Sequence, residues 1–228
     1  MIAVGLCAAM VTMGCNNMQK GAGIGAAGGA LLGAVVGKIA GNTAVGAAVG
    51  GAVGAGTGAL IGKHMDKVKA QAEAVQNAQV EQVTDANGLQ AVKVTFDSGI
   101  LFTTGSSTLS QTAMTSLSQF ANNVLKVNTD CDVAIQGYTD NAGWKNSTAE
   151  QSVQKNLQLS QQRANAVSTY LKSLGVSTNQ IRSVDGFGEA NPVADNATAA
   201  GKQQNRRVEV YLYASQAMIQ AAEAGTLQ

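Results

Sequence analysis

The fold of this chain is decided by one stretch, Asn156-Leu157-Gln158-Leu159-Ser160-Gln161-Gln162-Arg163-Ala164. On a helix Asn156 and Arg163 lie on the same face, two turns apart, because helical positions repeat every 3.6 residues. Leu159 shares that side and can hold the helix against a sheet, which leaves Arg163 at the rim of the apolar face. A guanidinium in such a place can take a carboxylate with two parallel hydrogen bonds.

Strands and helices are expected to alternate around this helix. The hydrophobic patterns predict, in order, a strand at 91–96, a helix at 109–127, a strand at 132–137, the long helix that Gly175 ends, a strand at 181–187 and a strand at 205–213. Asn87-Gly88 between two β-prone runs predicts a hairpin, so the folded domain should begin near Val80. This order predicts an α+β sandwich with helices on one face of a mixed sheet.

An aspartate follows the predicted strand 132–137 in the sequence Gly137-Tyr138-Thr139-Asp140. Sheet proteins place ligand-binding groups at strand ends, and a carboxylate there can hold an ammonium. Asp140 and Arg163 together can therefore grip a ligand that carries both an ammonium and a carboxylate.

Five motifs in fixed order resemble the OmpA-like peptidoglycan-binding domain family. They are Phe96-Asp97-Ser98 with Thr108-Leu109, Gly137 to Asp140, Asn156 to Ala164, Gly186 to Glu189 with Asn191-Pro192, and Asn205-Arg206-Arg207-Val208-Glu209. The resemblance covers residues 94–213. It implies a βαβαββ sandwich that binds peptidoglycan non-covalently, through the meso-diaminopimelate of the stem peptide. It also implies a binding set of Asp140 and Arg163, assisted by Asn156 and Thr139, whereas Arg206 and Arg207 are expected to brace the last strand.

One stretch departs from the family pattern. Residues 141–155 are longer than the usual connection by roughly two helical turns, each of about 3.6 residues, and contain Trp144, the only tryptophan. The extra residues can extend the helix, cover the pocket or contact the glycan. Trp144 can stack on a sugar or belong to the core, and Tyr138 stands where the family usually has a histidine.

The first 15 residues resemble a bacterial lipoprotein signal. The stretch is apolar and ends in Thr12-Met13-Gly14-Cys15, which predicts lipidation of Cys15. A basic opening is missing, so the true start can lie upstream of Met1. An ordinary cleaved signal and a retained membrane segment remain as alternatives.

Glycine recurs every fourth residue between positions 21 and 62, in two arrays separated by Asn42-Thr43. Residues four apart stack on one helix face, so each array makes a glycine stripe that favours close helix packing, most often within a bilayer. The segment resembles the glycine-zipper region of outer-membrane lipoproteins of the YiaD type. A membrane-associated or self-associating helical hairpin is expected, and a flexible linker is the alternative. Residues 63–82 are interpreted as a solvated helix or stalk.

The composition narrows the function further. Basic and acidic residues nearly cancel, at 15 and 14, which argues against a nucleic-acid partner. No recognisable cluster contains a catalytic base or nucleophile, so no enzyme, catalytic residue or cofactor is expected. His64 is the only histidine and is not expected to bind a metal, while Cys131 is expected to be a small buried residue.

The sequence thus predicts five segments: a signal and lipobox at 1–15, a glycine-zipper hairpin at 16–62, a helical or hairpin connector at 63–87, an OmpA-like domain at 88–214 and a tail at 215–228. The expected function is a periplasm-facing tether of the outer membrane to peptidoglycan, with homo-oligomers possible. The alternative is an oligomeric, pore-like glycine-zipper assembly for which the wall domain is only a tether.

Overall fold

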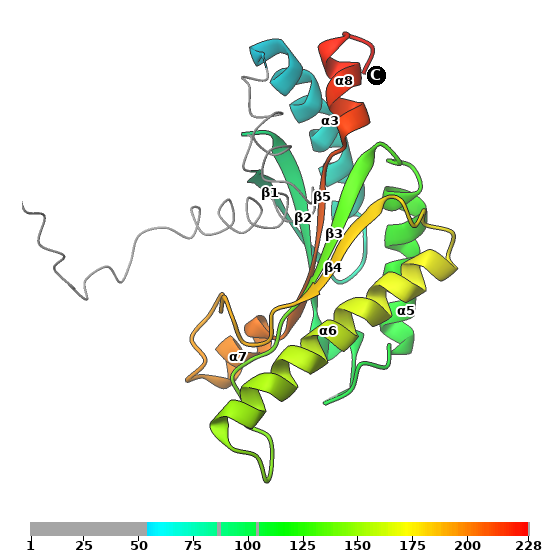
Figure 1. Cartoon of the computed structure of the whole chain (residues 1–228). Helices are drawn as coiled ribbons and strands as arrows, with labels where there is room; N and C mark the ends of the chain where they lie inside the picture. Colours follow the sequence, from blue (N-terminus) through cyan, green and yellow to red (C-terminus); the bar gives the residue numbers. More distant parts are fainter. Residues whose placement is uncertain (1–53, 86–87, 104, 228) are drawn as a thin grey trace, which may run out of the picture.

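The computed structural model describes residues 54–85, 88–103 and 105–227 (Figure 1). In chain order its elements are α3 (Ala55–Glu73), β1 (Ala78–Thr84), β2 (Gln90–Asp97), α4 (Ser98–Leu101), α5 (Gln111–Phe120), the π-helix η1 (Ala121–Leu125), β3 (Cys131–Gly137), α6 (Ala149–Ser173), β4 (Ile181–Gly186), α7 (Ala199–Asn205), β5 (Arg207–Ala214) and α8 (Gln216–Glu223). Cys15 and the glycine array up to Gly50 lie outside the described residues.

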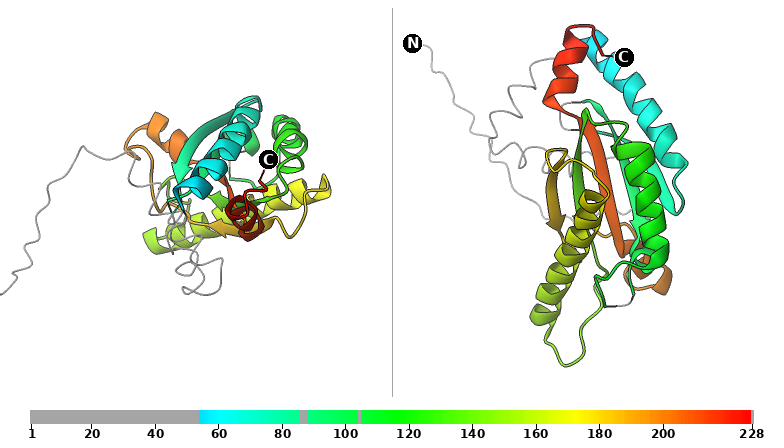
Figure 2. Two further views of the ribbon diagram at one scale, coloured as in Figure 1. Left: turned by 90° about the horizontal axis from the view of Figure 1, so that it is seen from above. Right: turned by 90° about the vertical axis from the view of Figure 1, so that its right-hand side faces the viewer.

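The strands form one five-stranded mixed sheet in the order β1-β2-β5-β3-β4. The pairs β1–β2, β2–β5 and β5–β3 are antiparallel, whereas β3 and β4 are parallel and are joined by α6. Helices α3, α5, α6 and α8 share a single apolar core with one face of the sheet (Figures 1 and 2). The predicted α+β fold is therefore confirmed.

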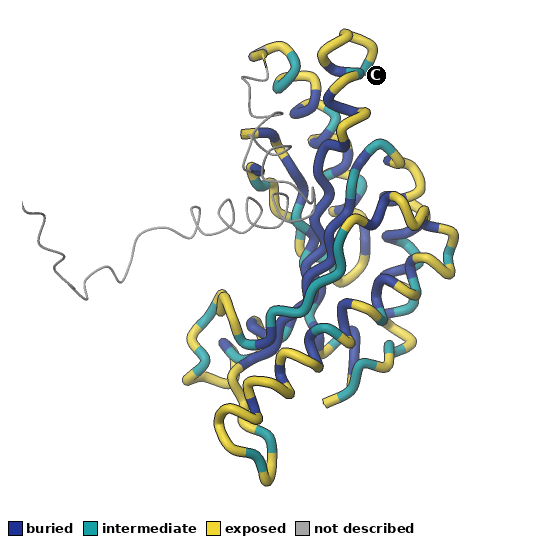
Figure 3. The backbone as a smooth tube through the Cα atoms, viewed as in Figure 1, coloured by how far each residue is buried: buried dark blue, intermediate teal, exposed yellow. Residues whose placement is uncertain are grey.

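Side chains alternate between the two faces of the sheet along each strand, and the apolar ones mark the face that the helices cover. On β5, Val208, Val210 and Leu212 point into the core beneath the helices, while Glu209 and Tyr211 point to the other face. Strand β5, in the middle of the sheet, is buried along its whole length, as the dark tube in Figure 3 shows. The inward side chains of β2, β3 and β5 fix the register of the sheet, because a slip by one residue would turn them outward.

Two local predictions are confirmed by the backbone. Strands β1 and β2 form the antiparallel hairpin expected around Asn87-Gly88, and Gly88 has a φ of 77°, a conformation that suits glycine. Gly175 follows α6 with a φ of 90° and ends the helix as expected.

The prediction of a solvated helix between residues 63 and 82 is wrong. Helix α3 already begins at Ala55, and its apolar residues Ile61, Met65, Val68 and Ala72 are buried in the core of the domain. The thin apolar stripe of α3 packs against β1, β2, η1 and α8.

The glycine array and the folded domain meet inside α3. A Cβ atom at Gly62, the last glycine of the array, would lie 2.8 Å from Oε1 of Gln90 on β2, the far end of a flexible side chain that can move aside. A side chain at Gly58 would meet nothing within 4 Å. The hairpin predicted for residues 16–62 otherwise falls before the described ranges and stays a prediction.

We expect Met65→Ala to destabilise the domain by about 2–5 kcal/mol, because Met65 is fully buried between α3 and the sheet. Chemical denaturation would measure the loss, with the exposed Lys67→Ala on the same helix as control. Equal stability of the two variants would show that α3 is not part of the cooperative fold.

The C-terminal residues also differ from the expected tail. Ser215 caps α8 by accepting a hydrogen bond from the backbone of Met218, and Met218, Ile219 and Ala222 are buried against the core. Among residues 54–85, 88–103 and 105–227, none of the helices has the length and apolar character required to span a bilayer.

Candidate ligand-binding site

The predicted site residues are brought together where β3 and β4 end beneath the N-terminal half of α6. Two glycines allow this close approach. A side chain at Gly137 would lie 2.2 Å from the backbone oxygen of Ser160, and one at Gly186 would lie 2.3 Å from the backbone nitrogen of Gln161. The glycines of the two motifs therefore let α6 rest directly on both strands.

Side chains of α6 then fix the end of the edge strand β4. Gln161 accepts a hydrogen bond from the backbone of Gly186 and donates one to the carbonyl of Val184, both at 2.9 Å. Ser160 accepts one from the backbone of Gly188 at 2.8 Å. These two motif residues position the loop that follows β4, a role the sequence analysis did not assign to them.

Asp140 is held by an arginine from the last motif. Its Oδ2 accepts a hydrogen bond from Nη1 of Arg206 at 2.5 Å, and its Oδ1 accepts one from the backbone of Ala142 at 3.0 Å. Asp140 is only 6% exposed, whereas the side chain of Arg206 is 37% exposed. Arg206 therefore pairs with Asp140 from a partly exposed position, a contact that the sequence analysis did not predict, while its expected bracing of the last strand stays a prediction.

Arg207 does fulfil the expected bracing role. It donates a hydrogen bond from Nε to the buried Glu209 at 2.7 Å, and its guanidinium lies 3.9 Å from the centre of the Tyr138 ring. Glu209 also accepts the hydroxyl of Tyr211 at 2.7 Å. This buried network fixes β5 beside the start of the Asp140 loop.

The guanidinium of Arg163 is hydrogen-bonded through Nε, and its two terminal amino groups are not bonded to any described residue. Its Nε donates to the carbonyl of Ser106 at 3.0 Å, and its guanidinium lies 5.1 Å from the centre of the Phe102 ring. Within the described part of the chain its two terminal amino groups have no hydrogen-bond or ion-pair partner. Burial, and next the charge of Arg206, lower the pKa of Arg163 from its ordinary value, while Asp140 acts in the opposite direction.

The charges of the site are therefore unequal. Arg163 and Arg206 both lie close enough to Asp140 to interact with it, yet only Arg206 pairs with it directly. Arg163, which pairs with no carboxylate among the described residues, is the guanidinium that can take a carboxylate of a ligand.

Asn156 ties the surrounding loops together. Its amide donates to the carbonyls of Asp140 and Ala142 and to Glu189, at 3.4, 3.2 and 3.3 Å, and its oxygen accepts the indole N–H of Trp144 at 2.8 Å. Trp144 is half-buried, with the Lys155 ammonium 5.8 Å from its ring centre. The extra residues thus do two things: 149–155 extend α6, and the preceding loop lies over Asn156.

The backbone of Thr139 is hydrogen-bonded, whereas its hydroxyl is not. Its N–H donates to the carbonyl of Gly188 at 2.8 Å and so links the two loops. Its buried hydroxyl has no hydrogen-bond partner among the described residues. A buried hydroxyl left without a partner costs free energy.

We expect Asn156→Ala to loosen the Asp140 loop and to destabilise the fold by about 1–3 kcal/mol, because its partners lose their hydrogen bonds. Trp144 is the only tryptophan, so its emission should shift to longer wavelength as the indole becomes more exposed. Asn122→Ala, at an exposed position, is the control. An unchanged emission spectrum would contradict this role of Asn156.

Fold and site together define a class of protein: a small α+β domain with a cluster of charged side chains where β3 and β4 end. Residues 101–206 match the model of the OmpA family, and residues 24–69 match the model of a glycine zipper. Residues 101–206 of this chain are therefore similar to the OmpA family, and the stretch that matches the glycine zipper ends within α3. The expectation that the chain is not an enzyme is confirmed by this class.

Known proteins agree with this assignment. The chain is 42% identical over 121 residues to the probable lipoprotein YiaD of Escherichia coli K12, a match that covers 52% of this chain and 47% of the relative. It is 45% identical over 86 residues to the peptidoglycan-binding protein ArfA of Mycobacterium tuberculosis H37Rv, covering 38% of this chain and 24% of the relative. The chain thus spans less than half the length of these two relatives.

A solved structure has the same fold. The cell wall anchor of the type VI secretion system (T6SS) from Pseudomonas aeruginosa is 26% identical, with a TM-score of 0.52, and the match covers 66% of this chain and 97% of that structure.

Proposed function

We propose that this protein binds peptidoglycan non-covalently, through the meso-diaminopimelate side chain of the stem peptide. That side chain ends in a carbon bearing both an ammonium and a carboxylate. The observation that carries the proposal is the guanidinium of Arg163, which is nearly buried and fixed at Nε, and whose two terminal amino groups have no partner among residues 54–85, 88–103 and 105–227. The similarity to a peptidoglycan-binding protein supports the same ligand.

In this proposal Arg163 takes the ligand carboxylate with two parallel hydrogen bonds. The ammonium binds Asp140, which already accepts Arg206 on Oδ2. Arg206 is the more exposed partner, so it can swing aside or contribute a third bond to the ligand carboxylate. Thr139, through its backbone bond to Gly188, and Asn156 hold the Asp140 loop in place.

The affinity for one stem peptide should be modest. Hydrogen bonds to charged groups contribute roughly 1.5–3 kcal/mol each, and part of that is spent on separating Asp140 from Arg206. Retention on a wall then depends on many sites and several anchored copies acting together.

The N-terminal part would attach this domain to a membrane. We propose that Cys15 is lipidated, and that the glycine zipper packs as a membrane-associated or self-associating hairpin; the match to a probable lipoprotein supports the first part. Residues 54–227 would then face the periplasm and tether the outer membrane to the wall. The oligomeric, pore-like assembly is the second candidate, and the glycine-zipper match is the observation that favours it.

Sedimentation with insoluble wall material tests the proposal. Purified chain should pellet with peptidoglycan that contains meso-diaminopimelate and much less with peptidoglycan that has lysine at that position, because lysine lacks the carboxylate. Asp140→Asn should stay in solution, whereas Asp66→Asn, at an exposed position on α3, should pellet like the wild type. Equal pelleting with both kinds of peptidoglycan would refute meso-diaminopimelate as the ligand.

A further inference from the structure

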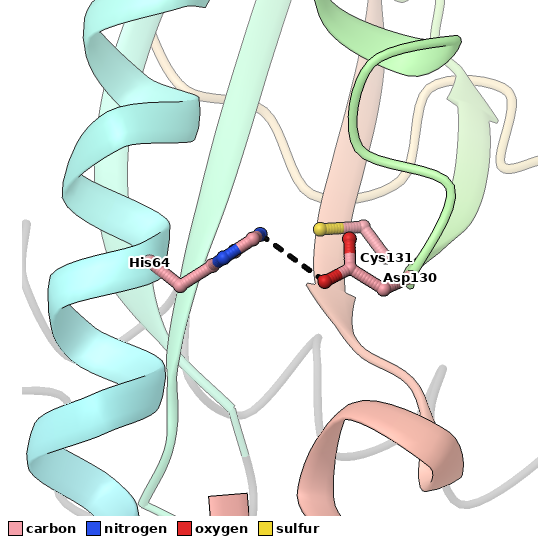
Figure 4. A group of neighbouring side chains, drawn as sticks. All are labelled: His64, Asp130 and Cys131. Atoms are coloured by element: carbon pink, nitrogen blue, oxygen red, sulfur yellow. Dashed lines mark ion pairs between the residues drawn. The ribbon is translucent and has the colours of Figure 1, made fainter. Parts of the chain in front are cut away.

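A second group of polar side chains lies where α3 passes the start of β3 (Figure 4). His64 belongs to α3, Asp130 precedes β3, and Cys131 is the first residue of that strand. One ligand atom from each side chain lies within 4.8 Å of the other two. Asp140 follows the other end of β3, so this cluster is separate from the candidate ligand-binding site.

The histidine of the cluster is not satisfied by the protein. Its Nε2 lies 3.4 Å from Oδ2 of Asp130, within ion-pair range, yet neither ring nitrogen has a hydrogen-bond partner among the described residues, and both atoms are buried. Buried imidazoles normally bond through their nitrogens, because an unpaired polar atom away from water is costly. Figure 4 shows the ring directed toward Asp130 and Cys131.

We propose that His64, Asp130 and Cys131 bind a divalent transition-metal ion of the zinc class, with water as the fourth ligand. Imidazole nitrogen, carboxylate oxygen and thiolate sulfur are the ligands that zinc takes, whereas magnesium and calcium take oxygen alone. The sequence analysis did not expect His64 to bind a metal. Asp130 and Cys131 lie 66 and 67 positions further along the chain, so no short sequence motif indicates the site.

The spacing fits a tetrahedral ion. Zinc bonds of about 2.1 Å to nitrogen and oxygen at a tetrahedral angle place the two atoms roughly 3.4 Å apart. The observed separation of Nε2 and Oδ2 is 3.4 Å. The sulfur lies within 4.8 Å of both atoms and must move closer to them to complete the set. The Asp130 side chain is 36% exposed, which leaves a path for the ion and its water.

Binding also changes the state of the thiol. An ion of the zinc class binds cysteine sulfur as the thiolate. The incoming ion forms a bond to sulfur, and the thiol proton is released to solvent. Metal binding is therefore accompanied by the loss of one proton from Cys131.

Such an ion would fasten α3 to the sheet. Helix α3 contains the end of the matched glycine zipper, and β3 leads to Asp140. The metal would thus join the segment that leads toward the N-terminus to the strand that carries the ligand-binding site.

Titration of the full, reduced and metal-free chain with Co²⁺ and then Zn²⁺ tests this site. We expect one equivalent of Co²⁺ to give thiolate-to-metal charge-transfer absorption, which Zn²⁺ abolishes by displacement and which Cys131→Ser lacks. We also expect Zn²⁺ alone to raise the Tm of the wild type by several degrees, because it binds the folded state. The matched control Asp66→Asn should respond like the wild type.

The variants His64→Ala and Asp130→Asn should lose at least tenfold in Zn²⁺ affinity and lose the rise in Tm. Asp130 is partly exposed, so its variant should fold even where replacement of a buried residue does not. Circular dichroism would verify the fold of each variant. Absence of the charge-transfer band in the wild type would overturn the proposal. A band that persists in Cys131→Ser would also overturn it, because Cys7 or Cys15 would then be the ligand.

Discussion

Replacement of Arg163 by alanine is expected to weaken binding of the stem peptide by about 10-fold to more than 100-fold. The two terminal amino groups of Arg163 are the free donors of the site, and each charged hydrogen bond contributes roughly 1.5–3 kcal/mol, where 1.4 kcal/mol is a factor of ten. Arg163→Lys should recover only part of the affinity, because a lysine keeps the charge and loses the two parallel bonds. Calorimetric titration measures both changes.

The control for this experiment is Arg182→Ala. Arg182 lies on β4 and pairs with Asp132, and its side chain is 46% exposed. Its loss removes the same charge from the chain while leaving the Asp140 region intact, so the affinity should stay unchanged. If folded Arg163→Ala bound as tightly as the wild type, the assignment of the site would be wrong.

The second large effect is expected at Gly137. A Cβ atom at this position would lie 2.2 Å from the backbone oxygen of Ser160 and 3.0 Å from its carbonyl carbon, and a helix backbone cannot yield as a flexible side chain does. Gly137→Ala must therefore push α6 away from β3. We expect a loss on the order of 3 kcal/mol or more in the free energy of unfolding, a large part of the stability of a domain.

Gly143→Ala is the matched control for Gly137→Ala. A Cβ atom there would meet only Oγ of Ser152, at an ordinary 3.7 Å. Its free energy of unfolding should stay within about 0.5 kcal/mol of the wild type in the same denaturant titration. Wild-type stability of Gly137→Ala would contradict the direct packing of α6 on β3.

Much of the fold could be predicted because the core strands carry their own pattern. Val208, Val210 and Leu212 alternate along β5, and Gly175 marks the end of α6, so element type and order follow from local sequence. The same kind of pattern led to the wrong prediction that α3 is surrounded by solvent. Met65 and Val68 form a stripe too thin to distinguish a solvated helix from one that covers a sheet, and only the tertiary contacts decide between them.

The site residues could likewise be predicted where a local motif marks them, but not where their role depends on contacts between residues far apart in the sequence. Asp140 and Arg163 could be proposed because each lies in a motif at a strand end or on a helix face. The partner of Asp140 could not be predicted, because Arg206 is 66 residues away and reaches it only after β5 lies beside β3. The role of Trp144 also depended on the loop conformation, which places its indole on Asn156.

The most direct test of the central claim is a calorimetric titration of the full chain with a soluble stem peptide that contains meso-diaminopimelate. The same peptide with lysine at that position serves as the comparison. We predict saturable binding of the first peptide at one site, with little heat from the second, because the ligand carboxylate is what Arg163 recognises. Equal binding of the two peptides, or no binding of either, would contradict the account.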